Sequence, residues 1–277
     1  MDPQTTLSDL MDATDGAALV RALGAGEFAL FYQPIVDLAT RQVVGAEALT
    51  RWPAANALGY QICEVVETLE LAGLVDELDS WVLGEGLRQL ATWQDDELVS
   101  ASFCLNINVS SLDFDSATFA GRIARAVNDS GVDPSGVVIE ITETQALTNI
   151  HDAQRNVAAV HEMGMHLALD DFGSGYSNFA RLHALTFDVV KIDRCFTQVC
   201  RTEIGSAFID ALVGLARCVD ARVIAEGIET PDAADRMHRA GCDAGQGFLW
   251  APAVPASLME SFLRGTVPLG ATSDRAA

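Results

Sequence analysis

The sequence of 277 residues is short of positive charge, of aromatic residues and of long apolar runs. Lysine and arginine together number 17, against 39 aspartates and glutamates, and the formal net charge is −22. A surface this acidic repels nucleic acid polymers and anionic membranes, so we expect neither as a partner. A role in solubility alone explains the charge equally well. No apolar run has the length of a transmembrane helix, so we expect no membrane insertion.

The six cysteines form no recognisable metal or disulfide pattern. No CxxC pair occurs, and the spacings fit neither a zinc site nor a small disulfide framework. Cys104, Cys195 and Cys218 lie in apolar stretches, which predicts buried thiols and a reducing compartment. The first residues, MDPQTTLSDLMDATDG, contain no apolar segment typical of a signal peptide, so we expect a cytoplasmic protein.

What the sequence does contain is a regular alternation of short and long patterned segments. Hydrophobic residues make up 49% of the chain, enough for a large core. Short runs rich in Val, Ile and Leu alternate with longer amphipathic stretches, which predicts parallel strands connected by helices. The predicted strands are 28–36, 42–49, 102–108, 137–142, 166–170, 187–192, 222–226 and 243–248. The predicted helices are 16–25, 61–72, 75–94, 116–129, 150–163, 176–184, 204–219, 231–240 and 255–264.

Eight strands in a chain of this length favour a closed α/β barrel over an open doubly wound sheet. No GxGxxG follows the first strand, as a dinucleotide-binding fold would require. Residues 1–15 are polar and 265–277 resemble a frayed tail, so we expect both ends to be flexible. The remaining residues, 16–264, are predicted to form one domain.

Polar side chains mark the ends of most predicted strands. They are Glu47, Asn108, Glu140, Asp170, Asp171, Lys191, Asp193, Glu226 and Gln246. The ends of parallel barrel strands meet on one face, where barrel enzymes place their active sites. Clustered carboxylates need a positive charge to stay ionised, and carboxylate and amide oxygens are the ligands that Mg²⁺ or Mn²⁺ prefers. The histidines do not join this pattern, which argues against zinc.

Each of these residues also has a purely structural explanation. A single acid at a strand end is more often a helix cap or a surface group, and Asn108 could begin a turn. Arg51 suits a phosphate or an exposed salt bridge equally well. Lys191 lies on a mostly apolar strand, and a buried lysine needs partners. Several independent structural explanations on one face are less economical than one metal site, so the joint pattern favours the metal site.

The residues at these positions resemble the motifs of the EAL-domain phosphodiesterases, in order along the chain. Residues 47–52 (EALTRW) resemble the EALxRW signature, and 31–34 (FYQP) the YQP segment. Residues 106–110 (NINVS) resemble the VNxS strand, and 140–143 (EITE) the ExTE strand. The later matches are 170–177 (DDFGSGYS), 191–194 (KIDR), 225–230 (AEGIET) and 241–247 (GCDAGQG). The resemblance covers roughly residues 16–264.

The resemblance implies a modified TIM-like (β/α)8 barrel whose first strand is antiparallel to the others. It implies hydrolysis of cyclic di-GMP to linear pGpG with two divalent metal ions, and a homodimer. By resemblance Glu47, Asn108, Glu140 and Asp170 would bind one metal, and Asp170 and Asp171 the second. Glu47, Lys191, Asp193 and Glu226 would be catalytic, with Lys191, Asp193 and Glu226 acting on the attacking water. The substrate and its water network would contact Gln33, Leu49, Arg51 and Gln246, and Glu143 would anchor the loop 172–177.

Some segments depart from the family pattern without removing a proposed ligand. The stretch 53–59 lacks the HPxxG pattern, and Ser174 replaces a threonine of the DDFGTGYS loop. Two alternatives to catalysis by this chain on cyclic di-GMP remain open. The chain could be a degenerate EAL domain that acts as a cyclic di-GMP receptor or interaction module. It could also be a barrel metallohydrolase or lyase with another substrate.

Overall fold

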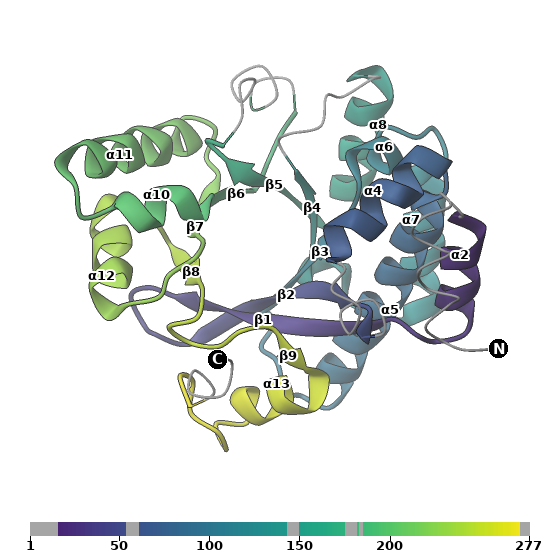
Figure 1. Ribbon diagram of the computed structural model, residues 1–277, viewed down its shortest axis with the longest axis horizontal. Helices are drawn as coiled ribbons and strands as arrows, with labels where there is room; N and C mark the ends of the chain where they lie inside the picture. Colours follow the sequence, from purple (N-terminus) through teal and green to yellow (C-terminus); the bar gives the residue numbers. More distant parts are fainter. Residues whose placement is uncertain (1–15, 54–60, 143–149, 175–181, 183–184, 272–277) are drawn as a thin grey trace.

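A computed structural model describes residues 16–53, 61–142, 150–174, 182 and 185–271 (Figure 1). The strands form one sheet in the order β2-β3-β4-β5-β6-β7-β8-β1-β9, and β1 also pairs with β2. This last pairing closes eight of the strands into a barrel. The strands are β1 (Ala29–Asp37), β2 (Val43–Arg51), β3 (Cys104–Asn108), β4 (Val137–Thr142), β5 (His166–Phe172), β6 (Val189–Ile192), β7 (Arg222–Ala225), β8 (Ala244–Gln246) and β9 (Val254–Pro255).

The direction of β1 distinguishes this barrel from a regular (β/α)8 barrel. It runs antiparallel to both of its barrel neighbours, β2 and β8, whereas consecutive strands from β2 to β8 are parallel. A connection of only five residues, 38–42, joins β1 to β2, and so short a connection can form a hairpin but not a parallel crossover. The expected modified barrel with an antiparallel first strand is therefore confirmed.

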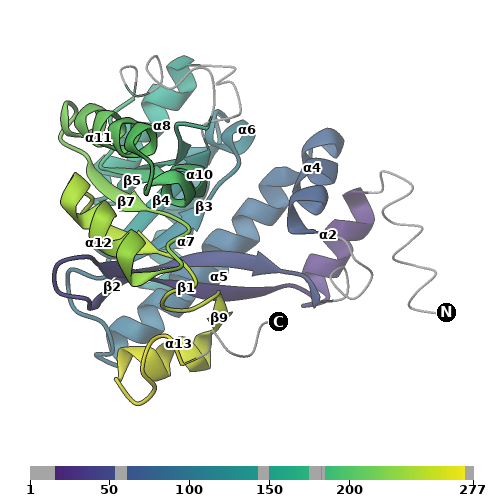
Figure 2. The same cartoon turned by 60° about the vertical axis from the view of Figure 1, so that its left-hand side comes forward.

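Helices cover the outside of the barrel (Figure 1). The helices α2, α4, α5 and α7 lie together on one side, and α10, α11 and α12 lie beside β6 to β8 (Figure 2). None of the described helices is both long and apolar enough to span a membrane. The helical segments are α2 (Gly16–Gly24), α4 (Ile62–Ala72), α5 (Val75–Asp95), α6 (Ser111–Phe114), α7 (Phe119–Ser130), η1 (Pro134–Gly136), α8 (Ile150–Glu162), α10 (Arg194–Val199), α11 (Glu203–Arg217), α12 (Pro231–Ala240) and α13 (Ala256–Leu263).

Most predicted elements agree with this list to within a few residues. The sequence patterns missed α6, α10 and β9, which are too short to show a period. The predicted strand 243–248 is shorter in the structure, where β8 spans Ala244–Gln246 and Gly247 follows it. The predicted helix 176–184 lies almost entirely outside the described residues.

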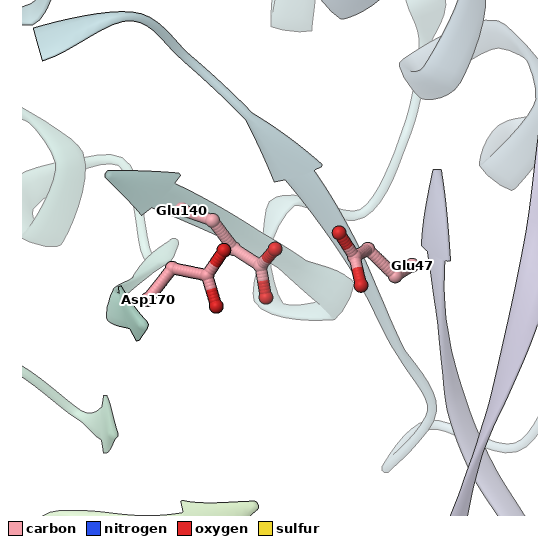
Figure 3. A group of neighbouring side chains, drawn as sticks. All are labelled: Glu47, Glu140 and Asp170. Carbon is pink, nitrogen blue, oxygen red and sulfur yellow. The ribbon is translucent and has the colours of Figure 1, made fainter. Parts of the chain in front are cut away.

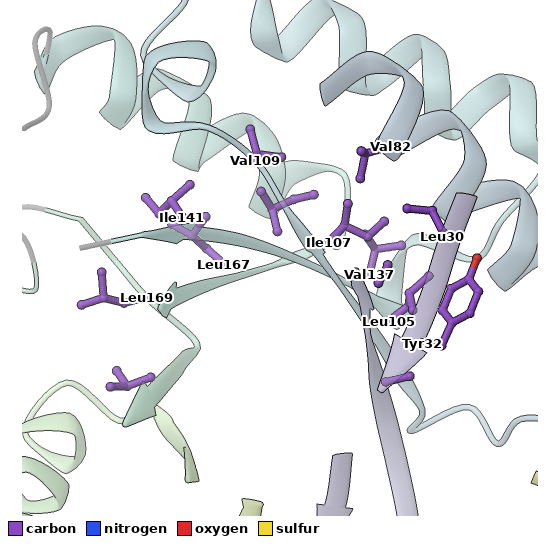
Figure 4. Packing of buried hydrophobic residues seen from close by; sticks show 14 of the residues in the cluster. Leu30, Tyr32, Val82, Leu105, Ile107, Val109, Val137, Ile141, Leu167 and Leu169 are labelled. Atoms are coloured by element: carbon purple, nitrogen blue, oxygen red, sulfur yellow. The ribbon is translucent and has the colours of Figure 1, made fainter. Parts of the chain in front are cut away.

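The strands direct alternate side chains to the two faces of the barrel wall. On β3, Leu105 and Ile107 face the helices and are fully buried, together with Ile141, Leu167 and Leu169 from β4 and β5 (Figure 4). A separate small cluster fills part of the barrel interior; it contains Ile35, Val138, Ala168, Val189, Ile224 and Ala244. Because side chains alternate with a period of two, Asn106 and Asn108 share the inner face of β3.

The cysteine prediction was wrong in its details. All six cysteines are free, but Cys195 and Cys218 are exposed and Cys104 is only partly buried. Cys195 lies in the first turn of α10 and Cys218 caps the end of α11, so neither thiol faces the core. The buried thiols are those of Cys200 and Cys242.

Candidate functional site

Carboxylates from several strands meet at the carboxyl end of the barrel. Glu47 lies on β2, Glu140 on β4 and Asp170 on β5, and their side chains point toward a common space (Figure 3). The parallel register places Asn108 of β3 beside Glu140, so the inner faces of neighbouring strands deliver polar groups at one level. This convergence follows from a closed barrel, in which the ends of strands far apart in sequence surround one axis.

Lys191 occupies the centre of this cluster. Its Nζ lies 3.1 Å from Oε2 of Glu47, 3.1 Å from Oε2 of Glu140 and 3.1 Å from Oδ1 of Asp170. A fourth carboxylate, Oε1 of Glu226, is 2.8 Å away. The lysine side chain has 0% exposure, and it is the only lysine in the whole sequence. One ammonium thus faces four carboxylates in a water-poor setting.

The imbalance of charge shows in the pKa values of the cluster. Burial and the neighbouring carboxylates raise the pKa of Glu140 well above its usual value, and the opposing effect of Lys191 is too small to cancel them. Burial likewise raises the pKa of Glu226 to about 8 and that of Asp170 above its usual value. For Lys191 burial alone would lower the pKa, but the four carboxylates outweigh it and raise the pKa well above the usual value. More positive charge is needed before all the acids can ionise.

Two groups of acidic oxygens have the spacing of metal sites. One consists of Glu47, Glu140 and Asp170, and the other of Asp170, Asp171 and Glu226. Within each group the candidate ligand atoms lie within 4.8 Å of one another, and Asp170 belongs to both. Oδ1 of Asp170 is buried and, apart from its ion pair with Nζ of Lys191, has no hydrogen-bond partner among the described residues. An all-oxygen set whose two groups share Asp170 fits hard divalent cations.

A backbone irregularity allows two successive aspartates to reach the site. In a regular strand Asp170 and Asp171 would point to opposite faces. The β5–β6 pairing shifts register between Leu169 and Phe172, and Asp171 has φ +57°, in the left-handed region. A non-glycine residue there is strained by about 1–3 kcal/mol, and such strain is concentrated at functional sites. Burial, Asp170 and Asp193 raise the pKa of Asp171 to about 6.

Amide side chains hold Glu47 in place. Asn108 Nδ2 donates to Oε1 of Glu47 at 2.7 Å, and Gln246 Nε2 donates to Oε2 at 2.6 Å. Gln246 also donates to Oε1 of Gln33 at 2.8 Å, and Gln33 donates to the Ala251 carbonyl at 3.0 Å. With Lys191, these donors outweigh the effect of burial and lower the pKa of Glu47.

Asn106 is a site residue that the sequence reasoning did not single out. It is buried, and its Nδ2 donates to Oε1 of Glu140 at 2.5 Å. This bond occupies one oxygen of Glu140 and leaves the other directed at Lys191. The signal was present in the sequence, because Asn106 is two residues before Asn108 and therefore lies on the same face of β3.

A cavity of about 320 Å³ opens beside the cluster. Among the predicted residues it is lined by Gln33, Glu47, Leu49, Asp170, Glu226 and Gln246. The sequence reasoning assigned no role to the other lining residues, which are Arg194, Gln198, Gly227, Glu229, Gly247 and Phe248. The Phe248 ring is an exposed aromatic surface at this cavity, and Arg194 brings a positive charge. Both features suit a ligand with planar rings and anionic groups.

Comparison with known sequences identifies the family. The sequence model of the EAL domain matches residues 17–253. The chain belongs to the EAL domain family. Cyclic di-GMP phosphodiesterase PA2567 of Pseudomonas aeruginosa is 34% identical over 249 residues, which are 89% of this chain and 42% of that protein.

A second relative is known both by sequence and by structure. Bifunctional diguanylate cyclase/cyclic di-GMP phosphodiesterase MucR of Pseudomonas aeruginosa is 30% identical over 239 residues, 86% of this chain and 35% of that protein. The solved structure of the PaMucR phosphodiesterase in its c-di-GMP complex matches with a TM-score of 0.76 and 30% identity, over 87% of this chain and 97% of that chain. The chain therefore spans less than half the length of these two curated relatives.

Two of the remaining predicted residues, Arg51 and Asp193, lie in the part of the chain that the structure describes. Arg51 is half buried, and its Nη1 donates to the Thr50 carbonyl at 2.9 Å; no carboxylate of the described residues pairs with it. Asp193 accepts a hydrogen bond from the Cys195 amide at 2.9 Å and caps α10. Burial alone would raise the pKa of Asp193, but the hydrogen bonds it accepts lower it. Glu143 lies outside the described residues.

Proposed function

We propose that this EAL domain is a metal-dependent phosphodiesterase that hydrolyses cyclic di-GMP to linear pGpG. The observation that carries the proposal is the pair of oxygen-ligand groups that share Asp170 and surround Lys191. Membership of the EAL family and the names of the relatives support the substrate. We also propose that residues 16–264 form the functional domain, in the cytoplasm and as a homodimer.

Two divalent cations, Mg²⁺ or Mn²⁺, suit the residues present. Glu47, Asn108, Glu140 and Asp170 would hold one, and Asp170 with Asp171 the other. When bound, such cations supply Lewis-acid charge and lower the pKa of bound water. A half-turn of the Asn108 amide would present its Oδ1 to a cation in place of the Nδ2 that now meets Glu47.

The chain's own residues would orient the substrate and move the proton. Lys191, locked between four carboxylates, would hold the attacking water through Nζ. Glu226, whose pKa is raised by burial in the metal-free site, is suited to accept a proton at Oε1. Asp193 would help to orient the water, and its lowered pKa keeps it ionised.

Substrate binding would use groups at the cavity and next to it. Arg51 is free of carboxylate partners among the described residues and would contact a phosphate oxygen. Leu49 would pack against the substrate. Gln33 and Gln246 would orient the water network near Glu47 through their hydrogen bonds. Glu143 would anchor the loop 172–177, as the family resemblance implies.

Product analysis tests the proposal directly. The purified chain is incubated with cyclic di-GMP and Mg²⁺, Mn²⁺ or EDTA, and the nucleotides are separated by chromatography. We expect metal-dependent formation of pGpG, abolished in Glu47→Gln and unchanged in the exposed control Arg239→Gln. Tight binding of cyclic di-GMP without product would instead support the receptor function. Turnover of another phosphodiester in preference to cyclic di-GMP would contradict the proposed substrate.

A further inference from the structure

The barrel contains a second cavity, at the end opposite the carboxylate cluster. Its volume is about 290 Å³, and it opens where the parallel strands begin. Apolar inner residues line it, among them Ile35, Val138, Val189, Ile224 and Ala244. The interior of a (β/α)8 barrel is normally filled by layers of bulky side chains. A space of this size therefore needs an explanation.

The explanation lies in small residues at inner positions. Gly45 and Ala244 contribute almost no volume to this layer. Gly45 cannot be replaced by a larger residue, because a Cβ atom there would lie 2.6 Å from the Cys104 carbonyl oxygen of the adjacent strand. The close approach of β2 and β3 thus keeps the position empty, and no other side chain fills the gap.

The mouth of this cavity carries an unpaired positive charge. Arg222 begins β7 on the same face as Ile224, and it lines the cavity. Its guanidinium forms no ion pair or side-chain hydrogen bond with any part of the chain that the structure describes. Asp37 lies near enough to feel the charge of Arg222, but it is held by hydrogen bonds from the Thr40 and Ala39 amides and does not pair with the guanidinium directly. The guanidinium at the entrance of the apolar cavity is therefore available to a ligand.

One acid that lines the mouth, Asp188, is already compensated. Asp188 accepts hydrogen bonds from the Leu167 amide at 2.8 Å and from Nε2 of His161 at 2.9 Å. Nδ1 of His166 lies 3.9 Å from its other oxygen. Asp220 also lies on the rim and would repel an anion on its own side. The preference of the cavity for an anion or a cation depends on Arg222 against Asp220 on the rim and Asp37 nearby, and probes of different charge can determine it.

We propose that this end of the barrel binds a small organic monoanion, a carboxylate attached to an apolar ring or chain. The apolar part would fill the cavity and the carboxylate would pair with Arg222. The size is appropriate, because an apolar cavity of about 150 Å³ accommodates benzene, and this cavity is roughly twice as large. One side chain connects the two ends of the barrel: Asn106 lines the cavity and also donates to Glu140.

Three probes of one shape and different charge test the proposal: 3-phenylpropionate, 3-phenylpropanamide and 3-phenylpropylamine. Binding to the whole chain in EDTA is measured by calorimetry and ligand-detected NMR, so no catalytic activity is needed. We expect saturable one-to-one binding of the carboxylate, and binding of the amide and the amine at least tenfold weaker. Equal or tighter binding of the amine, or no saturable binding of the carboxylate at millimolar concentrations, would overturn the proposal.

Variants locate the site. Arg222→Gln changes an exposed residue and should weaken binding of 3-phenylpropionate at least tenfold. Val189→Phe fills the cavity and should weaken all three probes. Arg239→Gln removes the same charge from the exposed surface of α12 and should change nothing. Unaltered binding of the carboxylate by Arg222→Gln would place the probe elsewhere and refute the assignment. None of these binding measurements depends on whether the chain hydrolyses cyclic di-GMP.

Discussion

Replacement of Lys191 by methionine removes the only cation of the described residues that lies inside the carboxylate cluster. Methionine keeps the length of the side chain and removes the ammonium. Four carboxylates within 3.1 Å of Nζ would then be left without their common partner. Removal of one partner from a buried ion pair typically destabilises a protein by about 3–5 kcal/mol. For a domain near this size that corresponds to a fall in Tm of about 6–20 °C.

The size of the loss should depend on pH and on metal. At pH 8 in EDTA, Lys191→Met must bury uncompensated negative charge, so the full loss is expected. At pH 5.5 the acids with raised pKa values, such as Glu140 and Glu226, take up protons and the difference from the unmodified protein shrinks. Millimolar Mn²⁺ at pH 8 should also reduce the difference, because a divalent cation replaces the missing charge.

Thermal unfolding followed by circular dichroism measures these differences. Arg239→Met removes a positive charge from the exposed end of α12 and serves as the control, with an expected change in Tm below about 2 °C. A Tm loss for Lys191→Met that is the same at pH 5.5 and pH 8, and that Mn²⁺ leaves unchanged, would refute the electrostatic reasoning. In that case Lys191 would contribute by packing alone.

Three further predictions concern the same cluster. Asn106→Ala should raise the Mn²⁺ concentration for half-maximal activity about 10–100-fold through the loss of its bond to Glu140, whereas the exposed Asn128→Ala should not. In EDTA, the contribution of Glu226 to the free energy of unfolding should be largest below about pH 4.5. It should fall as pH rises to about 8, because ionisation is disfavoured only in the folded state; urea titrations across this range test it. NMR of protein labelled with ¹⁵N-lysine should show one Nζ signal, from Lys191, that does not titrate up to pH 10.5.

The fold was largely predictable because it depends on periodicity. A strand such as β3 has apolar residues toward the helices and polar residues toward the barrel axis, and this alternation is visible in the sequence. The short elements α6, α10 and β9 were missed because two to six residues contain too little of any period. The antiparallel direction of β1 was predicted from family resemblance and not from its apolar pattern.

The convergence of Glu47, Glu140 and Asp170 was predictable because strand ends in a closed barrel meet on one face. The central place of Lys191 among four carboxylates was not, since its distances depend on the radius of the barrel and on side-chain rotamers. The roles of Asn106 and Arg194 were also overlooked, although both are neighbours of predicted residues. Short-range alternation indicates which face a residue occupies, but not which partner it meets across the barrel.

The bulge at Asp171 marks the limit of such reasoning most clearly. Two consecutive acids after a strand are compatible with an ordinary turn, and strict alternation would send the second away from the first. The register shift and the positive φ of Asp171 instead place both acids within one set of potential ligands. Strain of about 1–3 kcal/mol persists only where the surrounding structure imposes it. The strain at Asp171 would be offset when a cation shared with Asp170 is bound, which explains why β5 is irregular at this point.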